Sequence, residues 1–171
     1  MRKNGVRWQR CSGRCLGPPP VPSAFALAPD TGALTMSTFD PVPLAQVFYI
    51  SRSLAAPADV ETILLGARRH NQRRGVTGSL LHTGGHFAQL LEGPPSALAD
   101  TMAVIGADPR HEAVRRLLDG EIARRRFDGW SMAFVEAPGA DDLLEQLLVV
   151  RDVPAARAER VLALMFDATG A

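Results

Sequence analysis

The chain contains a single tyrosine, Tyr49, in the middle of the apolar run VFYI. This run predicts a buried β-strand from about Leu44 to Ser51. Alternation along the strand places Val47, Tyr49 and Ser51 on one face and Gln46, Phe48 and Ile50 on the other. Both faces are largely apolar, which favours a central strand covered on each side. A buried phenol needs a hydrogen-bond partner, so the layer on the Tyr49 face must supply one.

Helix and strand patterns alternate in the segments that follow. Val60, Leu64, Ala67 and Asn71 recur at helical spacing and predict a helix from Pro57 to Arg73, which Gly75 ends. Further elements are predicted at Val76–Thr83 and His86–Glu92 (strands joined by Gly84-Gly85), Ser96–Ala107 (helix), and Ala113–Ile122 and Trp130–Glu136 (strands). The order β-α-β-β-α-β-β predicts a ferredoxin-like α+β domain over residues 44–137, with two helices packed on one face of the sheet.

The two ends of the chain differ in pattern from this domain. Residues 1–43 are dense in Gly, Pro and Ser without apolar periodicity, so we predict a disordered tail in which Met36 offers an alternative start. Cys11 and Cys15 in this tail are too few ligands for a structural zinc site, and no metal is expected. Residues 138–171 repeat apolar side chains at helical spacing and predict a helical extension that caps the sheet or forms a dimer interface.

Charge and hydropathy narrow the classes of function. The formal net charge is +1, so no nucleic-acid partner is expected, and Arg124–Arg126 is interpreted as a solvated strand end or a phosphate neighbour. No apolar run reaches the roughly 18–20 residues of a membrane span. The start lacks the unbroken apolar core of a signal peptide, which favours the cytoplasm, and the Arg- and Ala-rich composition favours a bacterial source. No catalytic pattern of nucleophile and base stands out.

Two amide side chains occupy apolar faces of the predicted elements. Asn71 extends the buried stripe of the first helix, and Gln89 lies between Phe87 and Leu91 on one strand face. Each unpaired buried polar group costs about 1–3 kcal/mol, so both amides need partners. Backbone groups are one possibility for each residue. A heteroaromatic ring with alternating carbonyls and ring nitrogens, such as a flavin or a purine, is the other.

Four segments, in this order and at these spacings, carry a resemblance to a known family: YIS, HNQRRGVTGSLLHTGGHFAQLLEG, DPRH and FDGWSM. They resemble the BLUF family, the blue-light sensors that use FAD, over residues 44–135. The resemblance implies that Tyr49 gives an electron and a proton to the photoexcited flavin. It also implies that Gln89 lies between this tyrosine and the flavin N5/O4 edge, and that light leaves Gln89 rotated or tautomerised.

The resemblance also assigns the remaining site residues. It places the flavin contacts at His70, Asn71, Asp108 and His111, with Asn71 holding the carbonyl and N3 edge of the ring. Trp130 and Met132 match the pair on the last strand that couples the switch to the surface. The roughly 35 residues beyond that strand are too short for a cyclase or phosphodiesterase. The chain therefore resembles the short, stand-alone type, which signals through a partner or an oligomer change by way of its C-terminal helices and is not an enzyme.

Two other functions remain open at this point. One is a light-independent flavin redox enzyme on the same fold. The other is a ferredoxin-like interaction module without a cofactor.

Overall fold

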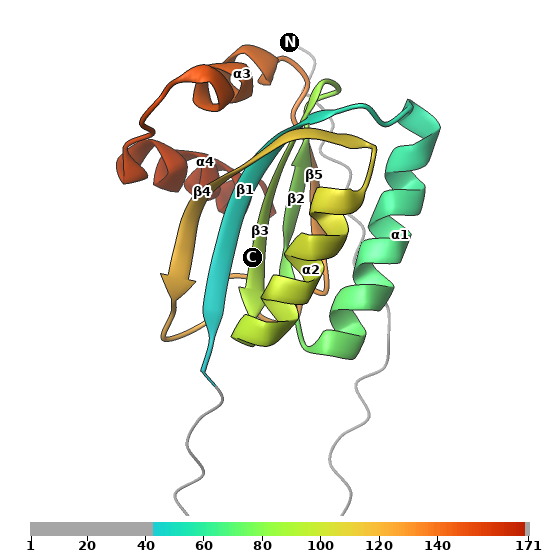
Figure 1. Cartoon of the computed structure of the whole chain (residues 1–171), viewed down its shortest axis with the longest axis vertical. Coiled ribbons are helices and arrows are strands. Elements are labelled where there is room, and N and C mark those ends of the chain that lie inside the picture. Colours follow the sequence, from blue (N-terminus) through green and yellow to red (C-terminus); the bar gives the residue numbers. More distant parts are fainter. Residues whose placement is uncertain (1–42, 170–171) are drawn as a thin grey trace, which may run out of the picture. The chain divides into compact units, whose positions relative to one another are not determined.

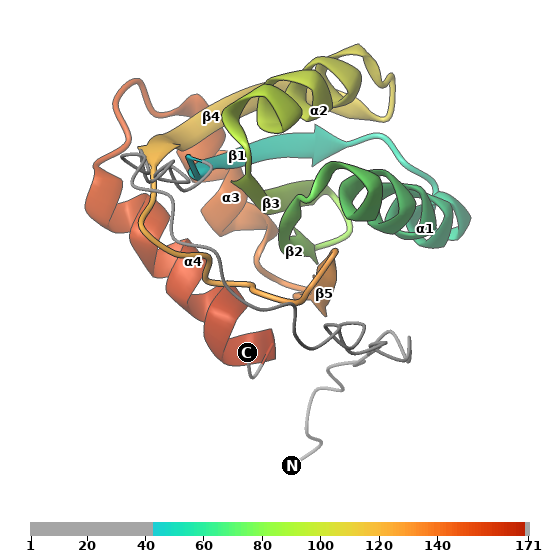
Figure 2. The ribbon, with the colours of Figure 1, turned by 90° about the horizontal axis from the view of Figure 1, so that it is seen from below.

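The computed structural model describes residues 43–169 of the chain. One five-stranded sheet is formed by β1 (Ala45–Ser53), β2 (Thr77–His82), β3 (His86–Gly93), β4 (His111–Glu121) and β5 (Ala133–Glu136), in the order β4-β1-β3-β2-β5. Only the β2–β5 pair of this sheet is parallel. Helices α1 (Pro57–Arg74) and α2 (Pro95–Ala107) cover one face, and α3 (Asp141–Val149) and α4 (Ala155–Thr169) cover the other (Figures 1 and 2). The predicted ferredoxin-like α+β fold with C-terminal helices is confirmed.

The sheet separates two hydrophobic cores. On the α3–α4 side, Phe48 and Ile50 of β1 are fully buried with side chains of β3, β5, α3 and α4. On the α1–α2 side, Val47 and Tyr49 pack with the apolar stripes of α1 and α2. The strand alternation therefore predicted the face of Tyr49 correctly. Each large side chain buried in this way contributes about 1.5–3 kcal/mol.

Helix α1 begins and ends at the residues that its sequence signals indicate. Pro57 occupies its first turn, where the missing N–H is not needed, and Asp59 accepts a hydrogen bond from the Ala56 N–H at 3.2 Å. Gly75 follows in the left-handed conformation at φ 64°, and its N–H bonds to Asn71 O. The termination at Gly75 fixes Asn71 at the last turn of the helix, on its buried side.

Several predicted boundaries differ from those of the structure, and three of the differences have a physical reason. β5 begins at Ala133 rather than Trp130, because the carbonyl groups of residues 130–132 accept hydrogen bonds from Gly78 N, Asn71 Nδ2 and Arg68 Nε instead of joining a regular ladder. Helix α2 begins at Pro95, one residue before the predicted Ser96, because proline suits the first turn of a helix. β4 begins at His111, two residues before the predicted Ala113. The strand continues through an irregular pairing beside Ala113, whose φ is 53°.

The segment before β5 is held by a buried carboxylate. Glu92, which is fully buried, accepts hydrogen bonds from the backbone N–H groups of Arg126 at 2.8 Å and Phe127 at 3.0 Å. The Arg125 guanidinium donates to Thr77 Oγ1 at 2.8 Å and also to backbone carbonyls. Arg126 pairs with Glu159 of α4. Arg125 and Arg126 therefore make structural contacts that their interpretation as a solvated strand end or phosphate neighbour did not include, although Arg124 and Arg126 are exposed.

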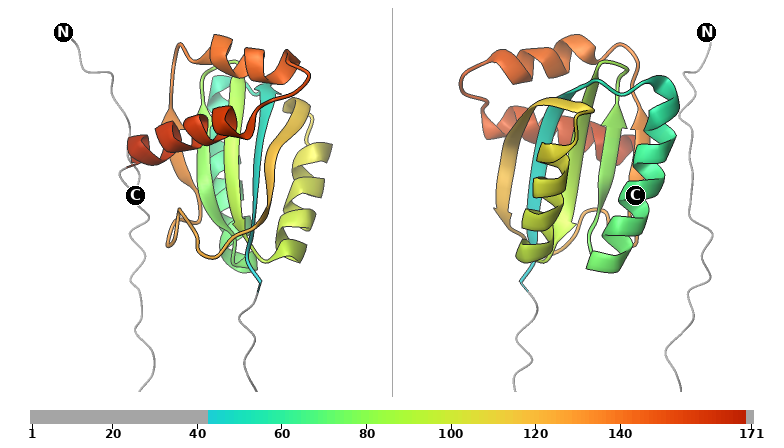
Figure 3. Two further views of the ribbon diagram at one scale, coloured as in Figure 1. Left: turned by 90° about the vertical axis from the view of Figure 1, so that its left-hand side faces the viewer. Right: turned by 45° about the vertical axis from the view of Figure 1, so that its right-hand side comes forward.

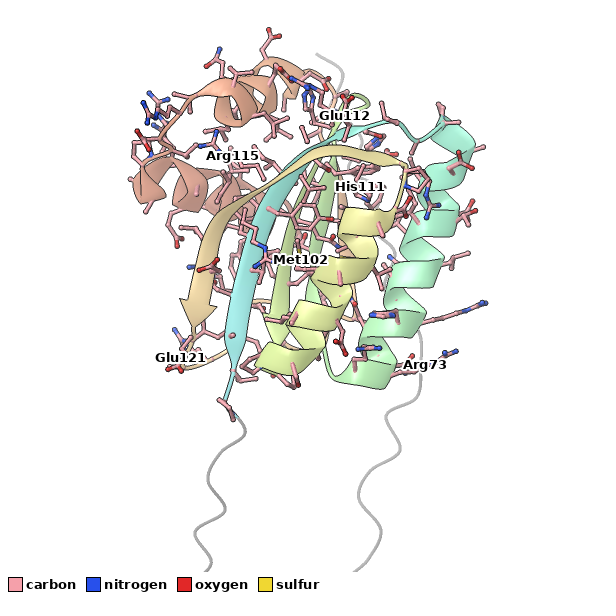
Figure 4. The ribbon with its side chains drawn as sticks, viewed as in Figure 1. Arg73, Met102, His111, Glu112, Arg115 and Glu121 are labelled. Atoms are coloured by element: carbon pink, nitrogen blue, oxygen red, sulfur yellow. The ribbon has the colours of Figure 1, made fainter. Side chains whose placement is uncertain are left out.

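Polar contacts fasten α3 to the sheet. Asp141, the first residue of α3, accepts from Thr83 Oγ1, Gly85 N and His86 Nδ1, the last at 2.9 Å. A Cβ on Gly85 would lie 2.8 Å from Asp141 Oδ1, so a larger residue at this position would displace the Asp141 carboxylate. His86 Nε2 also lies 2.9 Å from Glu145, so His86 bridges two carboxylates of α3. At the other end of α3, Arg115 of β4 donates to four backbone carbonyls (Figure 4).

Some expectations fall on residues that the structure does not describe. The predicted tail, with Met36, Cys11 and Cys15, lies almost entirely outside residues 43–169. Among the helices within that range, none is both long enough and apolar enough to cross a bilayer.

The close approach of β2 to β3 at Gly78 gives a test of the fold. A Cβ on Gly78 would lie 2.0 Å from the backbone oxygen of Leu90, and backbone cannot rotate away. We expect Gly78→Ala to lower the free energy of unfolding by about 3 kcal/mol or more. Gly106→Ala is the matched control, because nothing lies within 4 Å of its Cβ; it should leave stability unchanged or raise it by up to about 1 kcal/mol. Urea denaturation followed by circular dichroism measures both, and equal effects would contradict the register.

Candidate functional site

A cleft of about 360 Å³ lies over the sheet, between α1 and α2. That volume falls within the range of small-molecule and cofactor sites. Apolar lining comes mainly from the helices and from Leu80, and Gly66 on α1 has no atom within 4 Å of its Cβ position. The polar lining comprises Tyr49, Thr62, His70, Asn71, Gln89, Thr101, Asp108, Arg110 and His111. Six of these residues are predicted site residues, so the structure brings them to one cavity.

Tyr49 and Gln89 line the cleft from two strands of the sheet. They are direct cross-strand partners on β1 and β3, and the Tyr49 hydroxyl donates to Gln89 Oε1 at 2.5 Å. Tyr49 is 0% and Gln89 5% exposed. Burial raises the pKa of the Tyr49 phenol far above its usual value, and the negative charge of Asp108 raises it further. The phenol is therefore a neutral hydrogen-bond donor.

The nitrogen of the Gln89 amide has only a weak hydrogen-bond acceptor. Its Nε2 donates to the thioether sulfur of Met132 at 3.4 Å, and a thioether accepts hydrogen bonds poorly. Met132 is buried in the same core as Tyr49. Trp130, two residues earlier, packs instead against the core on the α3–α4 side. The predicted coupling pair is thus divided between the two faces, with only Met132 in contact with Gln89.

Asn71 is directed into the cleft from the last turn of α1. Its Nδ2 donates to Ser131 O at 2.8 Å, so backbone meets one half of the amide. Its Oδ1 accepts no hydrogen bond from any residue in the range 43–169. The amide of Gln89 is also incompletely satisfied, so two amides on neighbouring walls of the cleft can bind further donors or acceptors.

His70 lies beside Asn71 and reaches toward α2. Its Nε2 is 3.1 Å from Thr101 Oγ1, and Thr101 donates its own hydrogen to Ala97 O at 2.7 Å. The Thr101 oxygen is therefore the acceptor, which places the hydrogen of His70 on Nε2. This contact ties α1 to α2 across the cleft.

The turn between α2 and β4 supplies the charged part of the site. Arg110 donates to Asp108 through its backbone N–H at 3.0 Å and its guanidinium Nε at 2.9 Å, which lowers the pKa of that carboxyl to about 2. His111 Nδ1 is 2.9 Å from Ser51 Oγ, and its ring lies 6.1 Å from that of Tyr49, edge to face. Burial lowers the pKa of His111, so its imidazole is neutral at pH 7. Figure 4 shows His111 where β4 begins, beside the end of α2.

Sequence reasoning missed three contributors. Thr101 orients His70, Arg110 holds Asp108, and the Ser131 carbonyl anchors Asn71. The spacing of Asp108 and Arg110 in DPRH could have indicated Arg110, because it places two opposite charges two residues apart in one turn. No sequence signal indicated the Ser131 carbonyl, since its position depends on the irregular backbone before β5.

The family model for sensors of blue light using FAD matches residues 44–133, more than half of the chain. The chain belongs to the BLUF family. The matched range contains the whole cleft, and it ends one residue into β5. BLUF domains are flavin-binding blue-light sensors, which is the function class of this protein.

Known BLUF proteins match over the same region. The blue light- and temperature-regulated antirepressor BluF of Escherichia coli is 36% identical over 88 residues, which cover 50% of this chain and 22% of that protein. Photoactivated adenylate cyclase subunit beta of Euglena gracilis is 31% identical over 113 residues, 61% of this chain and 13% of that protein. The chain thus matches only a small part of either relative.

Solved structures agree with the fold. The dark-state structure of BlrB, a BLUF protein, has a TM-score of 0.61 and 36% identity, and the match covers 75% of this chain and 98% of that one. The BLUF domain of BlrP1 has a TM-score of 0.56 and 29% identity over 72% of this chain and 90% of that one.

The cleft fits a flavin ring by its chemistry. Its apolar walls suit an aromatic heterocycle, and the unsatisfied amide groups of Asn71 and Gln89 suit the alternating carbonyls and nitrogens at the polar edge of such a ring. His70, Asp108 and Arg110 add further polar groups to the lining of the cleft.

Because Tyr49 is the only tyrosine, its ionisation can be read directly. The folded protein holds the phenolic proton more tightly than the unfolded chain does, so ionisation favours unfolding above about pH 10. In protein freed of flavin, we expect phenolate absorbance at 295 nm to appear only together with the loss of ellipticity. The chain in concentrated urea should titrate near pH 10 as the control. Titration near pH 10 with the fold intact would contradict the burial of Tyr49.

Proposed function

We propose that Tyr49 and Gln89 are the photoreactive pair of this blue-light sensor. A bound flavin supplies the chromophore, which becomes a strong one-electron oxidant when it absorbs a blue photon. The observation that carries the proposal is the 2.5 Å hydrogen bond from the Tyr49 phenol to a glutamine that also lines the cleft. No other phenol exists in the chain to act as the donor.

Tyr49 loses an electron and a proton in the light reaction. A phenol that has lost an electron is far more acidic than a neutral phenol, so the proton moves along the existing hydrogen bond to Gln89 Oε1. The nitrogen of the amide would then give a proton to the flavin that accepted the electron. When that electron and one proton return to Tyr49, the phenol would be restored and Gln89 would be left rotated or as the other tautomer. The numbers of atoms and electrons are the same before and after the light reaction. The lasting change is the hydrogen-bond pattern around Gln89.

The surroundings of Gln89 support this switch. Its oxygen is held strongly by Tyr49, but its nitrogen has only the Met132 sulfur at 3.4 Å. Reversing the amide would direct its nitrogen toward Tyr49 and its oxygen toward Met132, which has no hydrogen to donate. The reversed amide needs a new donor or acceptor in the cleft, and the polar edge of a flavin supplies both. A change at Gln89 also changes its contact with Met132, which immediately precedes β5.

We propose FAD as the flavin. The family description names FAD, whereas one structure of Klebsiella pneumoniae BlrP1, 30% identical to this chain, is described with FMN. FAD and FMN have the same ring. Asn71 and Gln89, which we propose contact the ring, therefore bind both flavins in the same way. Release of the flavin by acid and its identification by mass spectrometry distinguishes them.

We propose that the signal leaves through a protein partner or an oligomer change at α3 and α4, without enzymatic turnover. Several relatives are described as cyclase subunits, and one as an antirepressor, so the family output differs between proteins. The proposed location is the cytoplasm, because the first residues lack the apolar core of a signal peptide, and the Arg- and Ala-rich composition supports a bacterial source. NAD(P)H oxidation by the flavin-loaded protein in darkness would contradict the sensor and favour a light-independent redox enzyme.

Substitution of the pair separates photochemistry from flavin binding. Tyr49→Phe removes the electron and proton donor, and Gln89→Leu removes the amide. We expect both variants to retain flavin and to lose the reversible red shift of its absorption after blue light. Ile50→Val, a conservative change on the opposite face of β1, is the matched control and should keep the shift. A Tyr49→Phe protein with an unchanged red shift would refute the assignment.

Asn71 should contribute mainly to affinity. Asn71→Ala removes a hydrogen bond to the polar edge of the ring and releases Ser131, so we expect flavin to bind about 5- to 150-fold more weakly, equivalent to about 1–3 kcal/mol. Quenching of flavin fluorescence on titration measures this affinity. Protein that does bind flavin should still show the red shift, and unaltered affinity would contradict the position of Asn71.

A further inference from the structure

Arg68 lies on the side of α1 that faces the edge of the sheet formed by β5 (Figure 3). It follows Leu64 by four residues and precedes Asn71 by three, so the three side chains share one side of the helix. Arg68 is half-buried, and its Nε donates to the backbone oxygen of Met132 at 3.1 Å. Within residues 43–169, no carboxylate forms an ion pair with its guanidinium. The hydrogen bond to Met132 is therefore the contact that fixes this side chain.

The carbonyl that Arg68 holds belongs to the residue whose sulfur contacts Gln89. Met132 is only 2% exposed, and its Sδ accepts from Gln89 Nε2 at 3.4 Å. A methionine side chain has three rotatable bonds and adapts to its surroundings, so its sulfur keeps one place only where the backbone beneath it is fixed. The ladder between β2 and β5 begins at the next residue, Ala133. Arg68 thus holds the backbone at Met132 where the sheet does not.

We propose that Arg68 is a positioning residue that holds Met132 against Gln89 and thereby shortens the life of the light state. The proposal rests on the function proposed above and takes the rotated form of Gln89 as the light state. The rotated amide directs its oxygen toward the Met132 sulfur, and neither atom has a hydrogen to donate. A methionine held by Arg68 cannot withdraw from this unfavourable contact. Because the contact exists in the light state alone, it favours the return to the dark state.

Two substitutions at Arg68 separate its hydrogen bond from its charge. The Nε2 atom of a glutamine lies the same number of bonds from Cα as the Nε atom of an arginine. Arg68→Gln therefore keeps a donor for the Met132 carbonyl and removes the charge, whereas Arg68→Leu removes both. Arg69→Leu is the matched control, because Arg69 is exposed on the same turn of α1 and its loss removes the same charge. Neither arginine lines the cleft, so all three variants should retain flavin.

The life of the light state is measured by the decay of the flavin red shift in darkness after a pulse of blue light. We expect Arg68→Leu to slow this decay about three- to tenfold, the effect of losing one hydrogen bond. Arg68→Gln should decay at close to the wild-type rate because its donor remains. Arg69→Leu should also decay at the wild-type rate. A residue that only stabilised the fold would lower the free energy of unfolding without changing this rate.

A second measurement reports on Met132 in darkness and does not use the photoreaction. In the flavin-loaded full chain with isotope-labelled methionine methyl groups, Met132 gives one of the methyl signals of the NMR spectrum, and its absence from Met132→Leu identifies it. We expect Arg68→Leu to shift or broaden this signal, because the sulfur and its methyl group are then no longer held in one place. Arg68→Gln and Arg69→Leu should leave the signal unchanged.

Each result bears on a different part of the proposal. An unchanged Met132 signal in Arg68→Leu would overturn it, and so would a shifted signal with an unchanged decay. Equal slowing in Arg68→Leu and Arg68→Gln would also overturn it, because the charge and not the hydrogen bond would then be responsible. A wild-type protein without any red shift would contradict the photoreactive pair instead, and the methyl signals would then decide alone whether Arg68 holds Met132.

Discussion

The hydrogen bond between Tyr49 and Gln89 depends on the register of the two central strands. The two residues face each other across β1 and β3, and both are buried under α1 and α2. A slip of one residue would oppose Tyr49 to Ala88 or Leu90 and would turn one set of side chains to the other core. The close approach at Gly78 and the turn at Gly84 position β3 against β2 on its other side, so the contact that we propose as photoreactive depends on both neighbours of β3.

The sequence contained enough information for the fold and the centre of the site because both depend on local periodicity. Alternation in β1 placed Tyr49, alternation in β3 placed Gln89, and helical spacing placed Asn71. These patterns are visible in the sequence because the side chains on the buried face of a helix or strand recur at the fixed period of that element. The resemblance of the ordered motifs then supplied the ligand, which periodicity alone left open between a flavin and a purine.

The features that sequence reasoning missed depend on irregular backbone and long-range polar contacts. Residues 130–132 look like strand, but side chains of α1 take up two of their carbonyl groups, so Trp130 and Met132 turn to different cores. His86 binds two carboxylates of α3, a role that no spacing in the sequence indicates. Contacts between residues more than 50 positions apart have no spacing rule, and only the folded chain shows them.

Tyr49 is unique in the chain, so a tyrosine isotope label is a label at one residue. The most direct measurement of the central claim is the light-minus-dark infrared difference spectrum of the flavin-loaded protein grown with ring-deuterated tyrosine. If light changes the hydrogen bond between Tyr49 and Gln89, bands of the phenol ring will appear in the difference spectrum and will shift with the label. A spectrum that shows flavin bands but is unaffected by the label would contradict the participation of Tyr49 in the switch.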